Sequence, residues 1–312
     1  MNNVLQVLKR GDVRRSVGRW VKETPYLRSV RLLQPDTRLW FRESGTLPSI
    51  LLIGAQRSGS TFLHDTLVQK TSVQGSPLQK EVHYFDNKYY RSLQWYSKFF
   101  LPLTGDEKEQ KKNVEASPYY LYHPAVPRRV KEALGDVRVV AVLRDPVERA
   151  ISQYKWIRQV GLETRSAEDA FRYDAERLDW ERDPEYLKRF DDPLYFDFDH
   201  IHRGYLRRSL YDVQLRRWLQ YFDPSRIRIV GSSVLFDQTT MVLSELAEFL
   251  GVEQGVGQQE ESVNQNSSRD DIPVSAEARR IAERHLQGVP ERTEALLTDQ
   301  MVIGSQLRCG GE

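Results

Sequence analysis

Short apolar runs alternate with segments of helical periodicity along most of this chain. Three runs have the length and composition of strands buried in a parallel sheet, and they occupy residues 48–53, 137–143 and 226–230. Helical patterns occupy residues 61–70, 146–161, 205–222, 243–250, 275–287 and 290–300. Strands that alternate with helices predict an α/β fold, with a mainly parallel β-sheet flanked by helices on both faces.

The remaining segments show no clear period. Residues 1–46 are basic and interrupted by Gly and Pro, residues 162–205 are rich in charged and aromatic side chains, and residues 254–270 have the composition of a loop. We therefore predict a basic N-terminal extension over 1–46 and a single domain over 47–312, with an insertion at about 162–205.

Two of these segments leave alternatives open. The basic extension is either a solvated helical segment packed on the core or a lip that attracts an anionic substrate or a membrane surface. The aromatic side chains of the insertion either form a small core of their own or stack on sugar rings. They are Tyr173, Trp180, Tyr186, Tyr195, Phe196 and Phe198.

Composition narrows the classes of protein. The 46 basic residues nearly balance 44 acidic ones, so the net charge of +2 does not indicate a nucleic-acid binder. The single cysteine, Cys309, cannot form an internal disulfide, and the six histidines are scattered, so we expect no metal site. The apolar stretch at Met1 is too short for a signal peptide, and no run approaches the ~20 apolar residues that span a bilayer. We therefore expect a cytoplasmic protein.

A glycine-containing loop follows the first predicted strand. Residues 54–61 read Gly-Ala-Gln-Arg-Ser-Gly-Ser-Thr, which is the spacing of a P-loop with Ser60 in place of the lysine. Gly59 allows the main chain to approach an anion, and the N–H groups and dipole of the following helix attract it. The spacing predicts an anion-binding loop on a P-loop-like sheet; the alternative is a chance Gly-Ser turn.

The missing lysine bears on which nucleotide the loop binds. That lysine normally reaches the β- and γ-phosphates of a nucleoside triphosphate. No strand ends in the aspartate that would hold magnesium, whereas Arg57 can supply positive charge from within the loop. A P-loop nucleotide or small-molecule kinase is therefore the alternative rather than the first prediction.

Three further segments extend the pattern: residues 80–86 (Lys-Glu-Val-His-Tyr-Phe-Asp), 115–119 (Glu-Ala-Ser-Pro-Tyr) and 139–152, which contains Leu-Arg-Asp-Pro. Together with the loop, these motifs resemble the sulfotransferase family. The likeness is to the carbohydrate branch that includes the heparan sulfate N- and 3-O-sulfotransferases. It covers roughly residues 48–300 and implies a soluble, bacterial-type member.

The resemblance implies binding of 3′-phosphoadenosine 5′-phosphosulfate (PAPS). It assigns the loop to the 5′-phosphosulfate, through Gln56, Arg57, Ser58, Gly59, Ser60, Thr61 and Phe62. It assigns Arg144 and Ser152 to the 3′-phosphate. Arg144 ends a predicted strand and Ser152 lies two turns along the next helix, so both can face one phosphate. The alternative for Arg144 is a salt bridge to Asp145 or Glu148.

The resemblance also implies a catalytic strip. Glu81 would be the general base, Lys80 would stabilise charge on the bridging oxygen, and His83 and Asp86 would line the acceptor site. Whether Lys80 or Arg57 is the main charge stabiliser stays open. The alternative interpretation of residues 80–86 is a solvated polar loop without a catalytic role. Arg269 matches a residue that closes over the nucleotide in the family; its alternative is an ordinary loop.

These assignments imply transfer of a sulfuryl group from PAPS to a hydroxyl of a carbohydrate or glycolipid, without a metal. Ala116 stands where the heparan enzymes have a lysine that meets an acidic sugar, which argues against a heparan-like acceptor. Two further alternatives are a binding protein that kept the fold without the chemistry, and a nucleic-acid binder that uses the basic N-terminus. The retained Glu81 and Arg57 disfavour the former, and the near-neutral charge disfavours the latter.

Overall fold

The computed structural model describes residues 36–255 and 272–304. The chain divides into two units, Met1–Arg42 and Glu43–Glu312. Of the first unit only residues 36–42 are described, with a 3₁₀ turn at Thr37–Leu39. Most of the predicted basic extension, together with Arg269 and Cys309, therefore lies outside the described residues.

The second unit is built on one sheet of six strands, in the order β2-β3-β1-β4-β5-β6. The strands are β1 (Ile50–Gly54), β2 (Val73–Gln74), β3 (Lys112–Ala116), β4 (Arg138–Leu143), β5 (Ile227–Gly231) and β6 (Val302–Ile303). Every neighbouring pair is parallel. The sheet confirms the predicted fold class, and β1, β4 and β5 agree with the predicted strands to within two residues.

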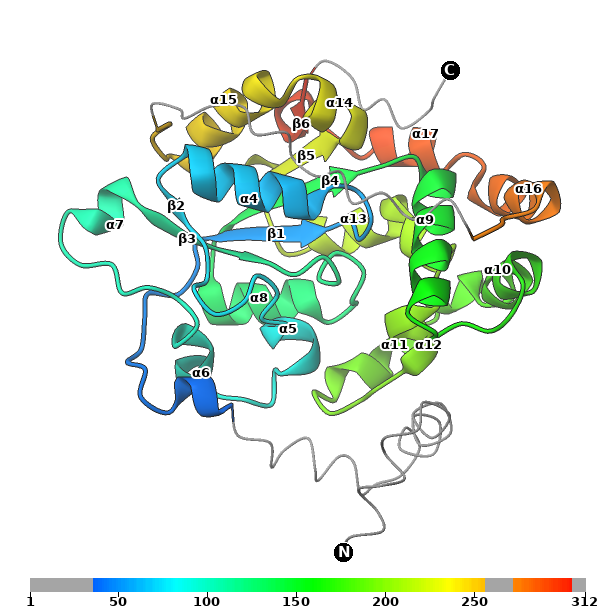
Figure 1. The fold of residues 1–312 in the computed structure, drawn as a ribbon, viewed down its shortest axis with the longest axis horizontal. Coiled ribbons are helices and arrows are strands. Elements are labelled where there is room, and N and C mark those ends of the chain that lie inside the picture. The colour runs from blue at the N-terminus through cyan, green and yellow to red at the C-terminus, as the bar shows by residue number, and fades with distance from the viewer. Residues whose placement is uncertain (1–35, 256–271, 305–312) are drawn as a thin grey trace, which may run out of the picture. The chain divides into compact units, whose positions relative to one another are not determined.

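Helices cover both faces of this sheet (Figure 1). The longer ones are α4 (Ser60–Lys70), α8 (Val126–Leu134), α9 (Pro146–Gln159), α10 (Ala167–Ala175), α13 (Tyr211–Leu219), α15 (Thr239–Leu250) and α16 (Ala276–Leu286). The shorter ones are α5 (Tyr84–Asn87), α6 (Leu93–Ser97), α7 (Glu107–Gln110), α11 (Pro184–Lys188), α12 (Phe198–His202), α14 (Ser232–Asp237) and α17 (Val289–Glu294).

The main core lies on the face of the sheet covered by α4, α14 and α15. Alternate residues of β1, Ile50 and Leu52, pack there with Leu63 and Leu67 of α4. The other residues of β1 and β4 are equally buried, because helices such as α8 cover the second face (Figure 1). Truncating a buried leucine such as Leu63 to alanine is expected to cost about 2–5 kcal/mol of stability. This packing holds the loop between β1 and α4 in place.

Two predicted helices are shorter than expected. The pattern over 205–222 begins as an α-helix only at Tyr211, because residues Arg207–Ser209 form a 3₁₀ turn whose side chains are buried. The pattern over 290–300 ends at Glu294 and gives way to a 3₁₀ turn and then β6. In both places, tertiary contacts override the helical periodicity.

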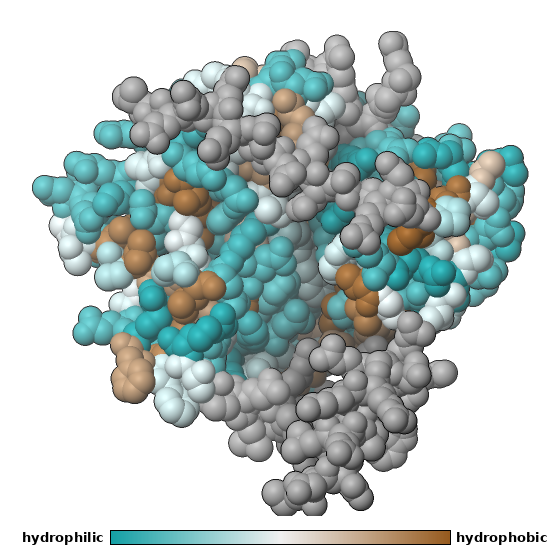
Figure 2. Space-filling model, viewed as in Figure 1, coloured by the Kyte–Doolittle hydropathy of each residue, from teal (hydrophilic) through white to brown (hydrophobic). Residues whose placement is uncertain are grey.

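The segment predicted as an insertion contains α10, α11 and α12 with 3₁₀ turns between them. Tyr186 is buried in a small cluster with Phe190 and Ala125, whereas Trp180 remains 38% exposed. A small core thus accounts for Tyr186. The surface in the view of Figure 2 is mainly hydrophilic, with small and separate hydrophobic patches.

Candidate active site

The predicted anion-binding loop lies between the carboxyl end of β1 and the first turn of α4. Gly59 precedes α4 with φ of 103°, and a Cβ atom there would lie 3.1 Å from the ring of Phe236. Both the backbone angle and the neighbouring ring therefore require glycine. The first N–H groups of α4 have no acceptor within the helix and point out of its end. This arrangement suits a phosphate or sulfate group.

Arg57 in the loop meets the two residues assigned to the 3′-phosphate. Its Nε donates to Ser152 Oγ at 3.2 Å, and a guanidinium nitrogen of Arg144 lies 3.5 Å from the Arg57 carbonyl oxygen. Burial, and then the charge of Arg144, lower the pKa of Arg57. The three predicted residues therefore lie together in the structure, and they form a cationic cluster suited to an anion.

The alternative for Arg144, an ion pair with Glu148, exists but is long. Its closest N–O distance is 4.0 Å, and both side chains are more than one-third exposed. Such exposed pairs contribute about 0–1 kcal/mol. Glu148 also pairs with Arg279 at 2.7 Å. The guanidinium of Arg144 is therefore available to a ligand.

Two side chains, one in the loop and one in the first turn of α4, show which groups at this helix end can contact a nucleotide. The hydroxyl of Ser58 is buried and has no hydrogen-bond partner in the described structure. A buried hydroxyl of this kind is usually satisfied by a group that binds there. Phe62, in contrast, packs on Phe236, with ring centroids 4.9 Å apart, and joins the hydrophobic core. Only the main chain of Phe62 is thus suited to the predicted role in nucleotide binding.

The strip at 80–86 lies against this loop. Lys80 Nζ donates to Thr61 Oγ1 at 2.7 Å and lies 3.8 Å from a carboxylate oxygen of Glu81. Burial lowers the pKa of Lys80, and the charge of Glu81 opposes that shift. Lys80 therefore connects the predicted base with the first turn of α4. These contacts favour the predicted site over a solvated polar loop.

Glu81, His83 and Asp86 form a continuous polar chain. His83 Nε2 lies 3.1 Å from Glu81 Oε2, and His83 Nδ1 lies 2.7 Å from Asp86 Oδ2. Burial alone would lower the pKa of His83, but the two carboxylates outweigh it and raise the pKa to about 10. His83 is therefore a cation at neutral pH, held between two anions.

Glu81 is the exposed end of this chain. Its side chain is 41% exposed, whereas that of Asp86 is fully buried. Burial raises the pKa of Glu81, but the hydrogen bond and charge of His83, helped by Lys80, bring it below its usual value. Glu81 is thus ionised at neutral pH and open on one side, as a proton acceptor must be.

A buried glutamate that the sequence left without a role positions the strip. Glu115 is fully buried and accepts hydrogen bonds from the hydroxyls of Ser117 and Tyr120, both at 2.8 Å, and from the hydroxyl of Tyr96. It also accepts from the main-chain N–H of His83 at 3.2 Å. Burial raises the pKa of Glu115 against these hydrogen bonds. The motif around residue 115 therefore fixes the main chain of the strip.

Backbone strain marks the same two segments. In the described chain, Arg57 and His83 are the only non-glycine residues with positive φ, at 70° and 58°. Such angles cost on the order of 1–3 kcal/mol and persist where surrounding structure enforces them, often at functional sites. Both fall on predicted site residues.

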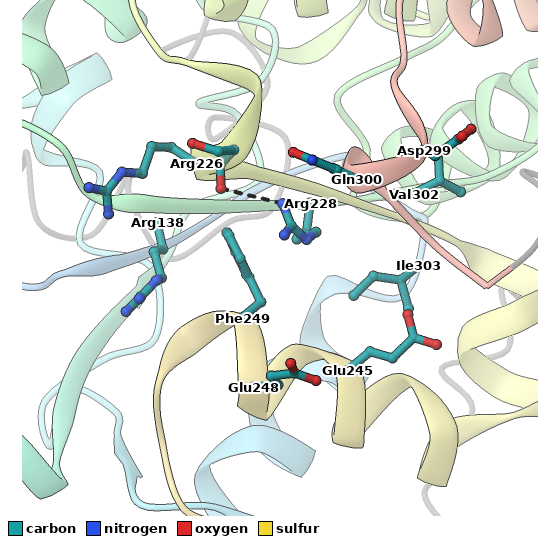
Figure 3. Close-up of a pocket in the computed structure, with 11 residues that line it drawn as sticks. Arg138, Arg226, Arg228, Glu245, Glu248, Phe249, Asp299, Gln300, Val302 and Ile303 are labelled. Carbon is teal, nitrogen blue, oxygen red and sulfur yellow. Dashed lines mark hydrogen bonds between the residues drawn. The ribbon is translucent and has the colours of Figure 1, made fainter.

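The cavity shown in Figure 3 lies at the other ends of the strands. It is lined by Arg138, Arg226, Arg228, Glu245, Glu248, Phe249 and Asp299, among others. Arg138 is the first residue of β4, and Arg144 directly follows its last residue. At about 3.3 Å per residue, the two ends of β4 are roughly 20 Å apart. This cavity is therefore separate from the phosphate loop, and its arginines face a similar number of carboxylates.

Within 36–255 and 272–304, no group of three or more His, Cys, Asp or Glu side chains could hold a metal ion. Among the helices of these same segments, none combines the length and the apolar character needed to cross a membrane.

Comparison with known proteins decides the family. Residues 47–272 match the model of a family described as "Sulfotransferase domain". The chain belongs to this family. A sulfotransferase from Alicyclobacillus acidocaldarius has a similar structure, with a TM-score of 0.58 and 22% identity, covering 81% of this chain and 96% of the other. At that identity the likeness shows the fold alone.

This sulfotransferase domain also matches curated relatives. They are the membrane-associated sulfotransferase kil1 of Dictyostelium discoideum (28% identical, 66% of this chain), the bifunctional heparan sulfate N-deacetylase/N-sulfotransferase 4 of Mus musculus (29%, 69%) and the heparan sulfate glucosamine 3-O-sulfotransferase 5 of Homo sapiens (26%, 68%). The matches cover 56%, 24% and 56% of these relatives, so the chain spans about half of their length or less. They support the predicted carbohydrate branch and disfavour the kinase alternative.

Proposed function

We propose that this sulfotransferase domain transfers the sulfuryl group of PAPS to a hydroxyl of a carbohydrate or glycolipid. The observation that carries the proposal is the hydrogen bond from Lys80 to Thr61, because it brings the Glu81–His83–Asp86 chain to the phosphate loop. A base, a cation and an anion-binding helix end thereby share one place.

The charges at the site support an assignment of the residues that bind the nucleotide. The first N–H groups of α4 and the Ser58 hydroxyl suit the 5′-phosphosulfate. Arg57, Arg144 and Ser152 gather where a second phosphate can accept hydrogen bonds from them. A nucleotide with phosphates on both sides of its ribose satisfies both groups. We propose that these cations and N–H donors offset the negative charge without a metal ion.

The transfer is an in-line displacement. The acceptor oxygen forms a bond to sulfur, and the bond between sulfur and the 5′-phosphate oxygen breaks, with its electron pair passing to 3′-phosphoadenosine 5′-phosphate (PAP). The acceptor proton passes to the carboxylate of Glu81. Positioning and electrostatics dominate such loose transfers. Because Lys80 lies between Thr61 and Glu81, we assign to it the stabilisation of the leaving oxygen.

His83 and Asp86 maintain the base in its reactive form. The imidazolium of His83 orients one carboxylate oxygen of Glu81 and holds the pKa of Glu81 below its usual value. Asp86, fully buried, fixes the ring from the other side. Glu81 therefore stays ionised until an acceptor hydroxyl reaches it.

The remaining parts of the proposal concern the chemical class of the acceptor and the location of the protein in the cell. The names of the relatives favour a sugar acceptor, and that of the 3-O-sulfotransferase favours a sugar hydroxyl. Ala116, which stands where the heparan enzymes have a lysine, is buried in β3, so this position offers no charge to an acidic sugar. Peripheral membrane contact through residues 1–46 is supported by the basic composition of that segment, and a cytoplasmic location completes the proposal.

A transfer assay tests this function. The chain is incubated with sulfur-labelled PAPS and separate panels of polysaccharides, glycolipids and small hydroxylated compounds. We expect labelled product, with the mass gain of one sulfuryl group, in a carbohydrate or glycolipid panel. A parallel incubation with labelled ATP and magnesium should leave every panel unlabelled. Phosphorylated product in that arm, or no binding of PAP, would reject the proposal.

A further inference from the structure

A buried arginine outside the predicted motifs contacts the phosphate loop. Arg208 lies in the 3₁₀ turn before α13 and is only 4% exposed. One of its terminal nitrogens donates to the side-chain oxygen of Gln56, the loop residue next to Arg57. The other donates to the carbonyl oxygens of His200, at 3.1 Å, and Ile201. Arg208 therefore connects the 162–205 segment with the loop.

The charge of Arg208 has no carboxylate partner in the described structure. Its neighbour Arg207 pairs with Asp174 at 2.6 Å and lies 3.9 Å from Glu181, but Arg208 forms no such ion pair. Its Nε is buried without a hydrogen-bond partner. Burial lowers the pKa of Arg208, yet arginine stays charged in proteins. A buried charge of this kind is costly and normally requires a counterion.

Two aromatic rings stabilise the cation of Arg208 and hold the side chain in position. The guanidinium carbon lies 4.7 Å from the ring centre of Tyr119 and 5.1 Å from that of Tyr122. Tyr122 in turn stacks on His200, and the hydroxyl of Tyr119 contacts His200 Nδ1 at 2.6 Å. The faces of these rings attract the cation without neutralising it. Arg208 is thus held in contact with the loop, and its positive charge remains without a carboxylate partner in the described structure.

We propose that Arg208 is a positioning residue for the phosphate loop, acting through Gln56, and that an anionic nucleotide in the loop supplies its missing counterion. This inference rests on the proposed function, because it names the nucleotide that supplies the charge. It adds a residue to nucleotide binding that no loop motif contains.

A purely structural role of Arg208 predicts a different effect of its replacement on nucleotide affinity. If Arg208 only braces the chain at His200 and Ile201, its replacement weakens folding but leaves the loop with normal affinity for nucleotide. If it positions the loop, its replacement weakens nucleotide binding, and that loss depends on Gln56. Affinity and stability therefore separate the two roles.

Arg129 offers a matched control. It is also a buried arginine without an ion pair in the described structure, and it donates to three main-chain carbonyls, of Phe85 at 2.8 Å, Phe190 at 2.6 Å and Asp191 at 3.4 Å. Its guanidinium also lies 4.7 Å from the ring centre of a tyrosine, Tyr89. None of these hydrogen bonds reaches the phosphate loop. Arg129→Met therefore reproduces the structural loss without the loop contact.

Calorimetric titration of the full chain with PAP tests the inference. We expect Arg208→Met to raise the Kd for PAP about tenfold or more, the usual effect of losing a charge-assisted contact. Arg208→Lys should recover part of this loss, and Arg129→Met should stay within about twofold of the unmodified chain. Thermal unfolding of the ligand-free variants measures stability separately.

A double-mutant cycle adds the dependence on Gln56. In the chain that carries both Gln56→Ala and Arg208→Met, the loss of affinity should be smaller than the product of the two single losses. An Arg208→Met chain that binds PAP as tightly as the unmodified chain would overturn the inference. Equal losses in Arg208→Met and Arg129→Met would also overturn it. An unmodified chain that does not bind PAP would instead reject the proposed function.

Discussion

The phosphate loop and the catalytic strip are held in place by different means. The loop at 54–61 depends on main-chain geometry, with Gly59 and the end of α4 forming the anion site. The strip at 80–86 depends on side chains, since Glu115, Thr61 and Asp86 fix it by hydrogen bonds. We therefore expect the main-chain site to bind an anion with serine in place of lysine, and the side-chain network to lose its function when one charge is removed.

The largest effect should come from the exposed end of the strip. Glu81→Gln keeps the size of the side chain but removes its ability to take a proton, so kcat should fall about 10²- to 10⁴-fold. Steady-state kinetics measure that loss, and titration with PAP should show an unchanged Kd because the loop is intact. Normal turnover in this variant would show that another group is the base.

The nucleotide-binding residues should respond in the opposite way, with a loss of affinity rather than of turnover. Removing the cation in Arg144→Met should weaken binding of PAP by about tenfold or more, with little change in the Kd for AMP, which lacks the 3′-phosphate. Titrations of both nucleotides into both chains measure this selectivity. An equal loss for the two nucleotides would place Arg144 at a different phosphate.

A smaller effect should follow from the residue beneath the strip. Glu115→Gln is nearly isosteric but replaces one acceptor oxygen by a donor, which then faces a hydroxyl or N–H group. We expect a loss of about 1–3 kcal/mol in the free energy of unfolding, together with a lower kcat and an unchanged Kd for PAP. Denaturant unfolding measures the loss of stability, steady-state kinetics measure kcat, and titration with PAP measures the Kd. An unchanged kcat would contradict the role of Glu115 in holding His83.

The charge of His83 predicts a dependence of stability on pH. Its pKa is raised in the folded chain to about 10, from an ordinary value of about 6.5. The pairing with Glu81 and Asp86 therefore stabilises the fold fully below about pH 6.5 and is lost as the pH rises through about 10. Denaturant midpoints of the unmodified chain and of His83→Gln should converge between pH 7 and pH 10.5. A constant difference across that range would show that His83 is neutral.

The same contrast explains what the sequence could predict. Gly54–Thr61 was recognisable because glycine spacing encodes backbone geometry locally, and β1, β4 and β5 because apolar strands are contiguous in sequence. The role of Glu115 was not recognisable, since its donors come from positions 83, 96, 117 and 120. Arg208 was missed for a similar reason, as it meets Gln56 across 152 positions. The strands β2 and β6 have two residues each, too few to show a period.

The smallest expected effect lies at the opposite ends of the strands. Arg226 borders the cavity of Figure 3, beyond the start of β5, and makes no side-chain hydrogen bond or ion pair with the described residues. Arg226→Ala should therefore change the free energy of unfolding by no more than about 0.5 kcal/mol and leave kcat and the Kd for PAP within about twofold. Its comparison with Arg144→Met, which removes an arginine at the carboxyl ends of the same sheet, makes the test specific. A large loss of nucleotide affinity in Arg226→Ala would show that the nucleotide binds at the amino ends of the strands, and would contradict the proposed site at their carboxyl ends.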